Sequence, residues 1–423
     1  MVNAKVRVKV RVMVMVKVKV KVMVKVRVKV MVKVKVKVMV RVMVKVRVKV
    51  KGMVMVRVEF LTTKDGKNEI NLLCGDNIKL LKTLAPNSVD SVVTDPPYGL
   101  KFMNKKWDHS VPSIKFWKEV LRVLKPGGHV LSFGGTRTYH RMAVAIEDAG
   151  FEIRDQIMWL YGSGFPKSHN ISKAIDKKLD QPQQTTYKPN YKNNDFGKGM
   201  GGGKTDQTTK PNSDLAKQWD GFGTALKPAN EPIVLARKPL SEKTIVDNVL
   251  KHGTGGLNID ASRVGTELIQ GGRSGRKDKS NFNASIGDKQ EKHQGRFPAN
   301  IILDEEAGNM LDKQSGSGCA SRFFYCAKTS KSERNAGLTD VTNNHPTVKP
   351  IKLMQYLIKL VTPPKGVVLD PFTGSGSTGV AAKVLGFGFI GMELDSYYFD
   401  IAKNRIKNTA IFMETKESDA RDE

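Results

Sequence analysis

The alternation of apolar, β-branched runs with segments of helical periodicity is the feature that most constrains what this chain can fold into. Strand-like runs lie at 70–73, 89–94, 129–133, 151–160, 367–369 and 388–392. Helical spacing of apolar residues recurs at 78–84, 116–124, 141–149, 351–360, 379–385 and 397–406. Strands that alternate with helices indicate a parallel sheet with helices on both faces. The sequence therefore predicts an α/β fold assembled from two segments that lie far apart in the chain.

The segment between these two halves, 162–344, is rich in Gly, Asn, Lys, Ser and Pro. Its order-like islands are short and lie at 232–240, 244–250, 296–303 and 321–327. This composition indicates a long insertion with little core of its own. The insertion need not be disordered throughout, because binding regions are often loop-rich segments on a rigid scaffold. The predicted organisation is a repeat at 1–58, a first half at 59–161, the insertion at 162–344, a second half at 345–410 and a tail at 411–423.

The N-terminal repeat has Val at every even position from 6 to 50 and only Lys, Arg or Met at the odd positions from 5 to 51. One strand of this length would far exceed natural strands, which have roughly 3–10 residues. Because Lys, Arg and Met can be encoded by AAG, AGG and ATG, the segment looks like a translated six-base tandem repeat. We expect it to take no part in the chemistry, as a disordered arm, an aggregation-prone strand ladder, or an extension upstream of a start at Met53 or Met55. The functional alternative is a cationic arm that holds DNA.

The net charge of +30 arises from 71 Lys and Arg residues against 41 Asp and Glu residues. Of the positive charges, 19 lie between Lys5 and Arg57 with no acidic residue among them, which leaves +11 on the rest of the chain. The basic character therefore does not depend on the repeat. Such a balance favours a polyanionic partner, either nucleic acid or an anionic membrane surface.

The numbers and spacing of cysteine and histidine residues indicate the cellular compartment and whether the chain binds a metal ion. The three cysteines are widely scattered and form no CxxC pair, so a reducing cytoplasm is the simplest location. The seven histidines include no pair at metal-ligand spacing with a third partner, and we expect no metal site. No apolar stretch approaches the roughly 18 residues of a membrane-spanning helix, and no secretion signal is visible.

A glycine loop follows the strand-like run at 367–369 and reads Asp-Pro-Phe-Thr-Gly-Ser-Gly-Ser-Thr over 370–378. Gly374 and Gly376 allow the backbone to approach a ligand closely. A second acid, Glu393, ends the next strand, where a carboxylate binds ribose hydroxyls in nucleoside-binding α/β folds. The loop lacks the Gly-Lys-Ser/Thr of a phosphate-binding P-loop. Together with Asp370, these residues predict a binding site for an adenosyl ligand. The alternative is a purely structural role, in which the glycines form a cap between strand and helix.

The sharper motif is Asp-Pro-Pro-Tyr at the end of the run 89–94, formed by Asp95, Pro96, Pro97 and Tyr98. Its place corresponds to the carboxyl end of a strand, where α/β sheets bind their ligands. The two prolines hold the backbone extended, so that carbonyls point outward. An exocyclic amino group is a poor nucleophile, and acceptance of its two N–H bonds by Asp95 and the Pro96 carbonyl would free its lone pair. Tyr98 offers a flat face for a base removed from the duplex.

These motifs resemble those of the amino-methylating DNA methyltransferases, which act on adenine N6 or cytosine N4. The resemblance is to the permuted order, with the Asp-Pro-Pro-Tyr half first, a target-recognition region next and the cofactor loop last. The segments at 164–168 and 228–232, and the stretch His345-Pro346-Thr347-Val348-Lys349-Pro350, are similar in style to phage and prophage members. The likeness covers about 72–406 and implies a Rossmann-like, seven-stranded methyltransferase sheet with a reversed final strand.

The resemblance also implies a role for each matching residue. The catalytic pocket would be formed by Asp95, Pro96, Pro97 and Tyr98. S-adenosyl-L-methionine would be held by Asp370, Phe372, Gly374 and Gly376, with Glu393 on its ribose and Asp76 on its adenine. Thr347 and Lys349 would approach its methionine end. The implied activity is site-specific methylation of adenine N6 in double-stranded DNA, by base flipping and direct in-line transfer.

Several alternatives stay open from the sequence. Asp at position 95, where Ser is the other choice, favours adenine, but cytosine N4 is the alternative target. A catalytically dead fold that only binds DNA is the rival from another class, and an RNA or protein methylase is a further one. The long basic insertion favours a reader of duplex DNA. A cognate restriction nuclease and a monomeric or homodimeric state are both compatible with the sequence, and it does not give the recognition site.

Overall fold

The computed structural model describes most of the chain outside the N-terminal repeat. The described residues are 57–62, 69–100, 108–164, 168–189, 205–270, 292–316, 320–327, 331–338, 342–345 and 347–409. The expectations for residues 1–56 and for the tail at 411–423 lie outside these residues. Within them, no helix is both long and apolar enough to cross a membrane.

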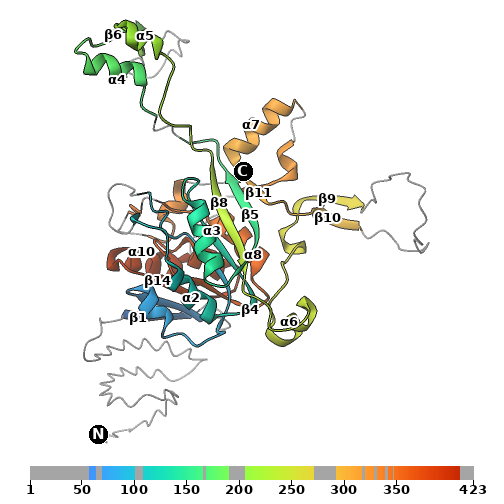
Figure 1. The fold of residues 1–423 in the computed structure, drawn as a ribbon. Coiled ribbons are helices and arrows are strands. Elements are labelled where there is room, and N and C mark those ends of the chain that lie inside the picture. Colours follow the sequence, from blue (N-terminus) through green and yellow to red (C-terminus); the bar gives the residue numbers. More distant parts are fainter. Residues whose placement is uncertain are drawn as a thin grey trace, which may run out of the picture.

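One large sheet forms the centre of the molecule (Figure 1). Its ten strands among the described residues lie in the order β1 (Arg57–Thr62), β2 (Glu69–Cys74), β14 (Gly388–Glu393), β13 (Val367–Asp370), β3 (Val89–Thr94), β4 (Leu124–Phe133), β8 (Asn230–Arg237), β5 (Glu152–Leu160), β11 (Ile301–Asp304) and β12 (Tyr325–Ala327). The C-terminal strands β13 and β14 lie between β2 and β3 of the first half. The two halves that the sequence separates are therefore one sheet.

Strand direction confirms the expected sheet. The five strands from β2 to β4 are parallel, whereas β8 runs antiparallel to both β4 and β5. The stretch β2-β14-β13-β3-β4-β8-β5 therefore contains seven strands with one reversed, β8, which lies next to last in this order and precedes β13 and β14 in the chain. Three more strands extend it: β1 is antiparallel beside β2, and β11 and β12 are parallel to β5 on the other side.

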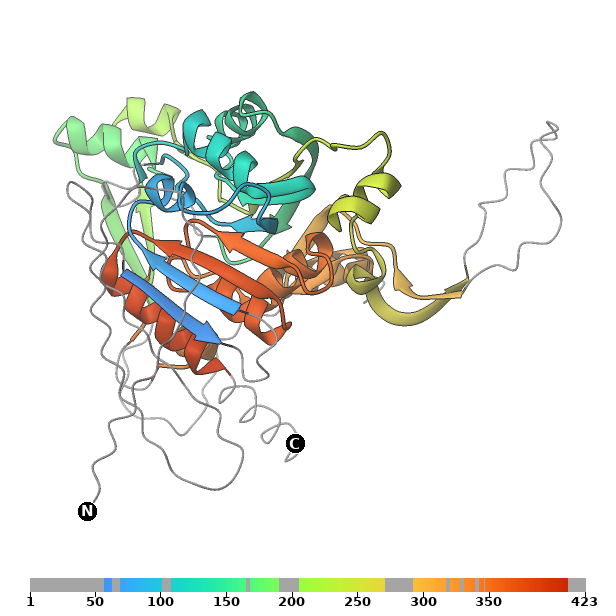
Figure 2. The same ribbon diagram turned by 90° about the horizontal axis from the view of Figure 1, so that it is seen from below.

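Helices cover both faces of the sheet (Figure 2). One face packs against α1 (Asn77–Leu81), α2 (Ile114–Val123) and α3 (Tyr139–Asp148), and the other against α8 (Ile351–Val361), α9 (Ser377–Val384) and α10 (Ser396–Lys407). Strand neighbours alternate between the two cores: Val92 faces the first and Val93 the second, and both are fully buried. Each such side chain stabilises the fold by about 1.5–3 kcal/mol.

Part of the range 162–344 belongs to the large sheet, and the rest forms elements outside it. It supplies β8, β11 and β12 to the sheet. Outside the sheet it carries α4 (Ile171–Lys178), the hairpin β6 (Gln184–Pro189) with β7 (Thr205–Lys210), and α5 (Asp214–Gln218). Figure 1 shows α4 and α5 away from the sheet, beyond the ends of β5 and β8. A second hairpin, β9 (Val264–Gln270) with β10 (Lys292–Arg296), also projects. The remaining elements are α6 (Ile245–His252), α7 (Glu305–Ser315) and the short turns η3 (Asp260–Ser262), η4 (Ala320–Phe323) and η5 (Lys331–Asn335).

Candidate active site

The Asp-Pro-Pro-Tyr motif and the glycine loop meet at the carboxyl ends of adjacent parallel strands. The Thr94 hydroxyl at the end of β3 donates to Asp370 Oδ1 at the end of β13 over 2.7 Å, and both residues are buried. A cavity of about 790 Å³ opens at this edge and is lined by both motifs. The sheet thus brings together residues that are more than 270 positions apart in the sequence.

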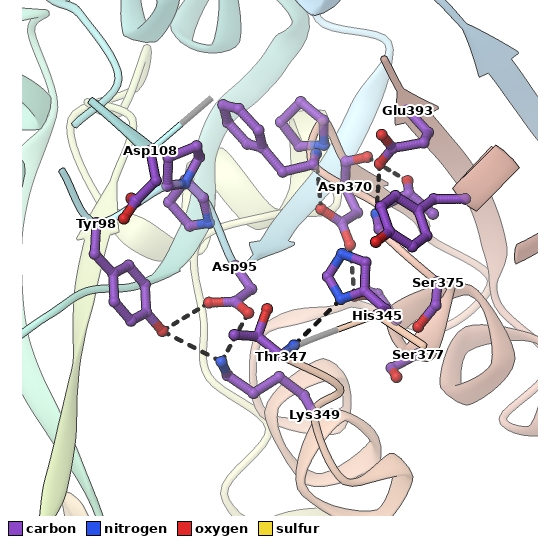
Figure 3. A pocket seen from close by; sticks show the side chains of 18 of the residues that line it. Asp95, Tyr98, Asp108, His345, Thr347, Lys349, Asp370, Ser375, Ser377 and Glu393 are labelled. Carbon is purple, nitrogen blue, oxygen red and sulfur yellow. Dashed lines mark hydrogen bonds and ion pairs between the residues drawn. The ribbon is translucent and has the colours of Figure 1, made fainter. Parts of the chain in front are cut away.

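The four residues of the Asp-Pro-Pro-Tyr motif line the cavity, and Figure 3 shows Asp95 and Tyr98 among them. The Tyr98 hydroxyl donates to Asp95 Oδ1 over 2.7 Å. The turn after Tyr98 is fixed because Asp108 accepts hydrogen bonds from the amides of Gly99 and Leu100. Burial, followed by the nearby Asp95 and Glu231 carboxylates, raises the pKa of Tyr98 well above its usual value. Tyr98 therefore keeps its proton and remains a donor at physiological pH.

Lys349 lies with the catalytic motif. Its ammonium donates to Asp95 Oδ2 over 2.7 Å and to the Tyr98 hydroxyl over 3.2 Å, as Figure 3 shows. It also lies 3.1 Å from Glu231 Oε2 and 4.8 Å from the centre of the Phe133 ring. Burial alone would lower the pKa of Lys349, but the two carboxylates outweigh it and raise that pKa. The ammonium is therefore a permanent charge beside Asp95.

The glycine loop needs its glycines for space and for backbone conformation. Gly374 and Gly376 have φ angles of +52° and +89°, which favour glycine. A Cβ atom at Gly376 would lie 2.9 Å from the Cα atom of Ala402 in α10. A Cβ atom at Gly374 would lie 3.0 Å from Nε2 of His345, on the cavity side. The loop therefore packs closely against α10 on one side and against His345 at the cavity on the other.

Asp370 is buried beneath the loop and organises it. Its carboxylate accepts hydrogen bonds from Thr94, from the amide of Phe372 and from the hydroxyl of Thr378 over 2.6 Å. Burial raises the pKa of Asp370 to about 6, although these hydrogen bonds oppose the shift. The carboxylate thus holds both ends of the turn, from β13 to the first turn of α9.

Glu393 lies at the end of β14, on the other side of the loop. Its Oε2 accepts from the amide of Gly374 and its Oε1 from the amide of Asp395, both over 2.8 Å. Burial raises the pKa of Glu393 to about 7, against the effect of these two hydrogen bonds. A carboxylate fixed by two backbone amides at the rim of a cavity presents its remaining lone pairs to a ligand.

The other predicted ligand-holding residues also line the cavity. Asp76 caps α1 by accepting from the amide of Lys79 over 3.0 Å and is itself exposed. Phe372 packs against Phe116 of α2 with ring centres 5.0 Å apart. Thr347 is exposed at the rim, and its amide lies 3.4 Å from Nδ1 of His345. All twelve predicted site residues except Gly376 are cavity-lining, and Gly376 supports the loop from behind.

Three site residues were not predicted from the sequence. Glu231, at the start of β8, approaches both Lys349 and Tyr98. His345 lines the cavity and packs edge-on against Tyr398 at 4.6 Å. Arg405 of α10 is buried and donates to the carbonyl of Ser375 over 2.7 Å, which fixes the loop from below. A signal was present for Glu231 and His345, because each lies in a segment that resembles family members.

A sequence profile of the family described as DNA methylase, the N6/N4 methyltransferases, matches residues 89–404, well over half of the chain. The chain belongs to this family. It is 24% identical to the type II methyltransferase M.HindIII of Haemophilus influenzae over 81% of this chain and 97% of that protein. It is 23% identical to the type II methyltransferase M2.DpnII of Streptococcus pneumoniae over 81% and 91% of the two chains.

Among solved structures, the PvuII DNA methyltransferase, which is cytosine-N4-specific, aligns with a TM-score of 0.40 and 16% identity. The alignment covers 81% of this chain and 87% of that one. A likeness at this level gives no basis for a choice between adenine and cytosine. What the family establishes is a DNA methyltransferase that acts on an exocyclic amino group with S-adenosylmethionine as its cofactor.

The cavity fits that cofactor by the chemistry of its lining. Because Gly374 and Gly376 have no side chains, the backbone of the glycine loop itself forms one wall of the cavity. The Glu393 carboxylate, which the Gly374 amide holds in place, offers acceptor positions for ribose hydroxyls. A volume of about 790 Å³ lies within the roughly 300–1,000 Å³ of small-molecule sites. Asp76, Phe372, Gly374 and Glu393 would hold the cofactor, which when bound supplies an electrophilic methyl group on a sulfonium sulfur.

Proposed function

We propose that this enzyme methylates N6 of adenine at one short, specific sequence in double-stranded DNA, by base flipping and direct transfer. The observation that carries the proposal is the position of the Asp95 carboxylate. It is held by Tyr98 and Lys349 in the same cavity that the glycine loop and Glu393 line. An acceptor for the target amino group and a binding surface for the methyl donor therefore share one space.

Asp95 suits an amino group that must be made nucleophilic. The lone pair of an exocyclic amino group is delocalised into its ring, so that the neutral group attacks poorly. A carboxylate that accepts one N–H bond draws the nitrogen toward tetrahedral geometry, and the Pro96 carbonyl is the proposed second acceptor. Tyr98 and Lys349 fix the carboxylate before the base arrives, which removes the cost of orienting it during the reaction.

The target base must leave the duplex to reach this site, because the reacting amino group is otherwise engaged in base pairing. Tyr98, Tyr161 and Pro97 line the cavity and supply apolar and aromatic surface for an extruded base. The same geometry would accept a cytosine with its N4 amino group. We propose adenine as the target because position 95 is Asp rather than Ser. The alternative target is N4 of cytosine, and the experiment below distinguishes the two bases.

The parts of 162–344 that project from the sheet are proposed to read the DNA sequence. β5 ends and β8 begins at the cavity edge, and the chain between them carries α4 and α5 (Figure 1). On α4, Lys173, Lys177 and Lys178 are exposed. Near α5, the rings of Trp219 and Phe222 lie 5.0 Å apart and are 41% and 55% exposed. Exposed lysines beside aromatic surface suit phosphate and base contacts.

The names of the curated relatives, type II methyltransferases, support a further proposal for the setting. We place the enzyme in the bacterial cytoplasm, where it would mark its site in a restriction-modification system. The proposal includes a cognate restriction nuclease and an enzyme that acts as a monomer or a homodimer.

Long-read sequencing of DNA from a methylation-free bacterial host that expresses the chain tests the proposal. We expect N6-methyladenine at one short motif, and none in cells that express Asp95→Ala. N4-methylcytosine at a motif would reassign the base and keep the site. If a folded, cofactor-binding protein leaves host DNA unmodified, the proposal of a DNA-modifying enzyme fails.

A further inference from the structure

Glu231 reaches the cavity because β8 runs in the opposite direction to its neighbours. The carboxyl ends of β3, β4 and β5 lie at the cavity edge, and the antiparallel β8 brings its first residues to that same edge. Glu231 pairs in register with Trp159, the second-last residue of β5. Pro232 follows it and restricts Glu231 to extended backbone. The carboxylate therefore projects from a rigid central strand rather than from a loop.

Two carboxylates share one ammonium at this place. Lys349 Nζ lies 2.7 Å from Asp95 Oδ2 and 3.1 Å from Glu231 Oε2. The side chains are largely shielded, with exposed fractions of 7% for Lys349, 18% for Asp95 and 24% for Glu231. The Tyr98 hydroxyl links the same two acids, at 2.7 Å from Asp95 Oδ1 and 3.1 Å from Glu231 Oε2. The formal charges of the two acids and the lysine sum to −1.

The second carboxylate changes what the lysine does to the first. With Asp95 alone, Lys349 would form a neutral one-to-one ion pair, and the carboxylate would be a weaker acceptor for an approaching amino group. With Glu231 present, the attraction of the ammonium is divided between two acids. Asp95 then keeps negative charge toward the cavity, which favours the positive charge that develops on the amino nitrogen during methylation.

We propose that Glu231 is a positioning residue for methyl transfer, which acts by sharing Lys349 and Tyr98 with Asp95. The inference rests on the proposed function to the extent that Asp95 accepts the target amino group. It holds for adenine and for cytosine alike, because both present an amino group to the same carboxylate.

The test compares Glu231→Gln with a matched control, Glu152→Gln. Glu152 forms an ion pair with Arg237 at the far end of the same two strands, at 2.6 Å and outside the cavity. We expect kcat on unmethylated host DNA to fall about 10- to 100-fold in Glu231→Gln, which corresponds to one lost charge-assisted contact. The KM for DNA should change less than about threefold, and Glu231→Asp should recover part of the rate. Glu152→Gln should keep the wild-type kcat.

A double-mutant cycle asks whether Glu231 acts through Lys349. In a Lys349→Met background the charge that Glu231 shares is gone, so Glu231→Gln should change kcat less than about threefold. Multiplicative effects of the two changes would overturn the sharing mechanism. So would an unchanged kcat in Glu231→Gln in an active enzyme.

A readout that needs no turnover is the reactivity of Lys349 toward an amine-modifying reagent, followed by mass spectrometry. Loss of the Glu231 partner should increase labelling of Lys349 relative to wild type, and Glu152→Gln should not. Equal labelling in wild type and Glu231→Gln would overturn the inference. If the wild-type enzyme modifies no DNA, the proposed function fails, while the labelling still decides whether Glu231 holds Lys349.

Discussion

Asp95 has a partner for each of its oxygens, Tyr98 on Oδ1 and Lys349 on Oδ2. Replacement by Ala removes the acceptor for the target amino group and leaves the glycine loop and Glu393 in place. We expect Asp95→Ala to lower methyl transfer at least about 10³-fold, at or beyond the upper end for loss of one preorganised polar group. Binding of S-adenosylhomocysteine, measured by calorimetry, should stay within about threefold of wild type. Near-normal turnover in this variant would contradict the assignment of Asp95.

Glu393 should make cofactor affinity depend on pH. Its pKa is raised to about 7 by burial, so in the free enzyme the group is mostly protonated at pH 6 and mostly ionised at pH 8. Only the carboxylate can accept from both ribose hydroxyls, so affinity for S-adenosylhomocysteine should rise with pH. We expect binding about five- to tenfold weaker at pH 6 than at pH 8, because one pH unit below the pKa only about a tenth of the groups is ionised. In Glu393→Gln this dependence should vanish, and its persistence would assign it to another group.

For single residues, the sequence predicted which residues lie at the cavity, but it did not predict all of their contacts. The motif spacing predicted that Asp95 and the glycine loop lie near each other, and both line one cavity because the carboxyl ends of parallel strands share one edge. Lys349 was expected near the methionine end of the cofactor, and the structure shows its ammonium on Asp95. Glu231 lies in a segment that resembles family members, but the sequence pattern does not specify the pairing of β8 that brings Glu231 to Lys349.

The loop between β13 and α9 offers a test at the scale of an element. Gly376 combines a φ of +89° with a Cβ position only 2.9 Å from the backbone of Ala402. Gly253 has a φ of +74° with open space around it, and Gly256 has open space and no positive φ. We expect Gly256→Ala to change stability by under about 0.5 kcal/mol and Gly253→Ala to cost about 1–2 kcal/mol.

Gly376→Ala should cost more than Gly253→Ala because overlap with α10 adds to the same strain. It should also weaken cofactor binding, since relief of the overlap moves the loop toward the cavity. Urea unfolding of the three variants gives the stabilities, and calorimetry with S-adenosylhomocysteine gives the affinities. Equal costs for Gly376→Ala and Gly253→Ala would show that α10 yields to the extra atom.

Element boundaries were predicted best where periodicity was strong and worst where tertiary contacts decide. The apolar run 89–94 became β3 with the expected bounds. The next strand was expected from residue 129, yet β4 begins at Leu124 and passes through Pro126 and Gly127. There Asn248 of α6 donates to the carbonyl of Pro126 over 2.9 Å, a partner more than 120 residues away. The strand itself is extended by backbone pairing, because Leu124 pairs with Val89 of β3 and the amide of Gly127 donates to the carbonyl of Lys238, just beyond β8.

At the scale of the whole molecule, the sheet makes one unit from two distant segments. β13 and β14 complete the sheet between β2 and β3, and the buried Thr94–Asp370 hydrogen bond joins the halves at the site. The reversed β8 then adds a third segment, 230–237, to the same edge. The cavity is thus built from three parts of the chain, and the sheet order brings their charged residues together.

The repeat at 5–51 lies outside the described residues, and its composition still permits a prediction for the molecule. Removal of residues 1–52 deletes 18 of the 71 basic residues and no acidic one. All strands from β1 onward, both cores and the cavity lie in what remains. We therefore expect the truncated enzyme to fold and to keep its kcat, with the same methylated motif in host DNA.

What the truncation should change is the response of DNA binding to salt. Each phosphate that a lysine or arginine neutralises adds about 0.9 to the slope of log affinity against log salt concentration. If the repeat holds DNA, the truncated enzyme should show a shallower slope and weaker binding at low salt, and the two proteins should converge as salt rises. Identical slopes would mean that the repeat does not touch DNA, and failure of the truncated chain to fold would show that it is structural.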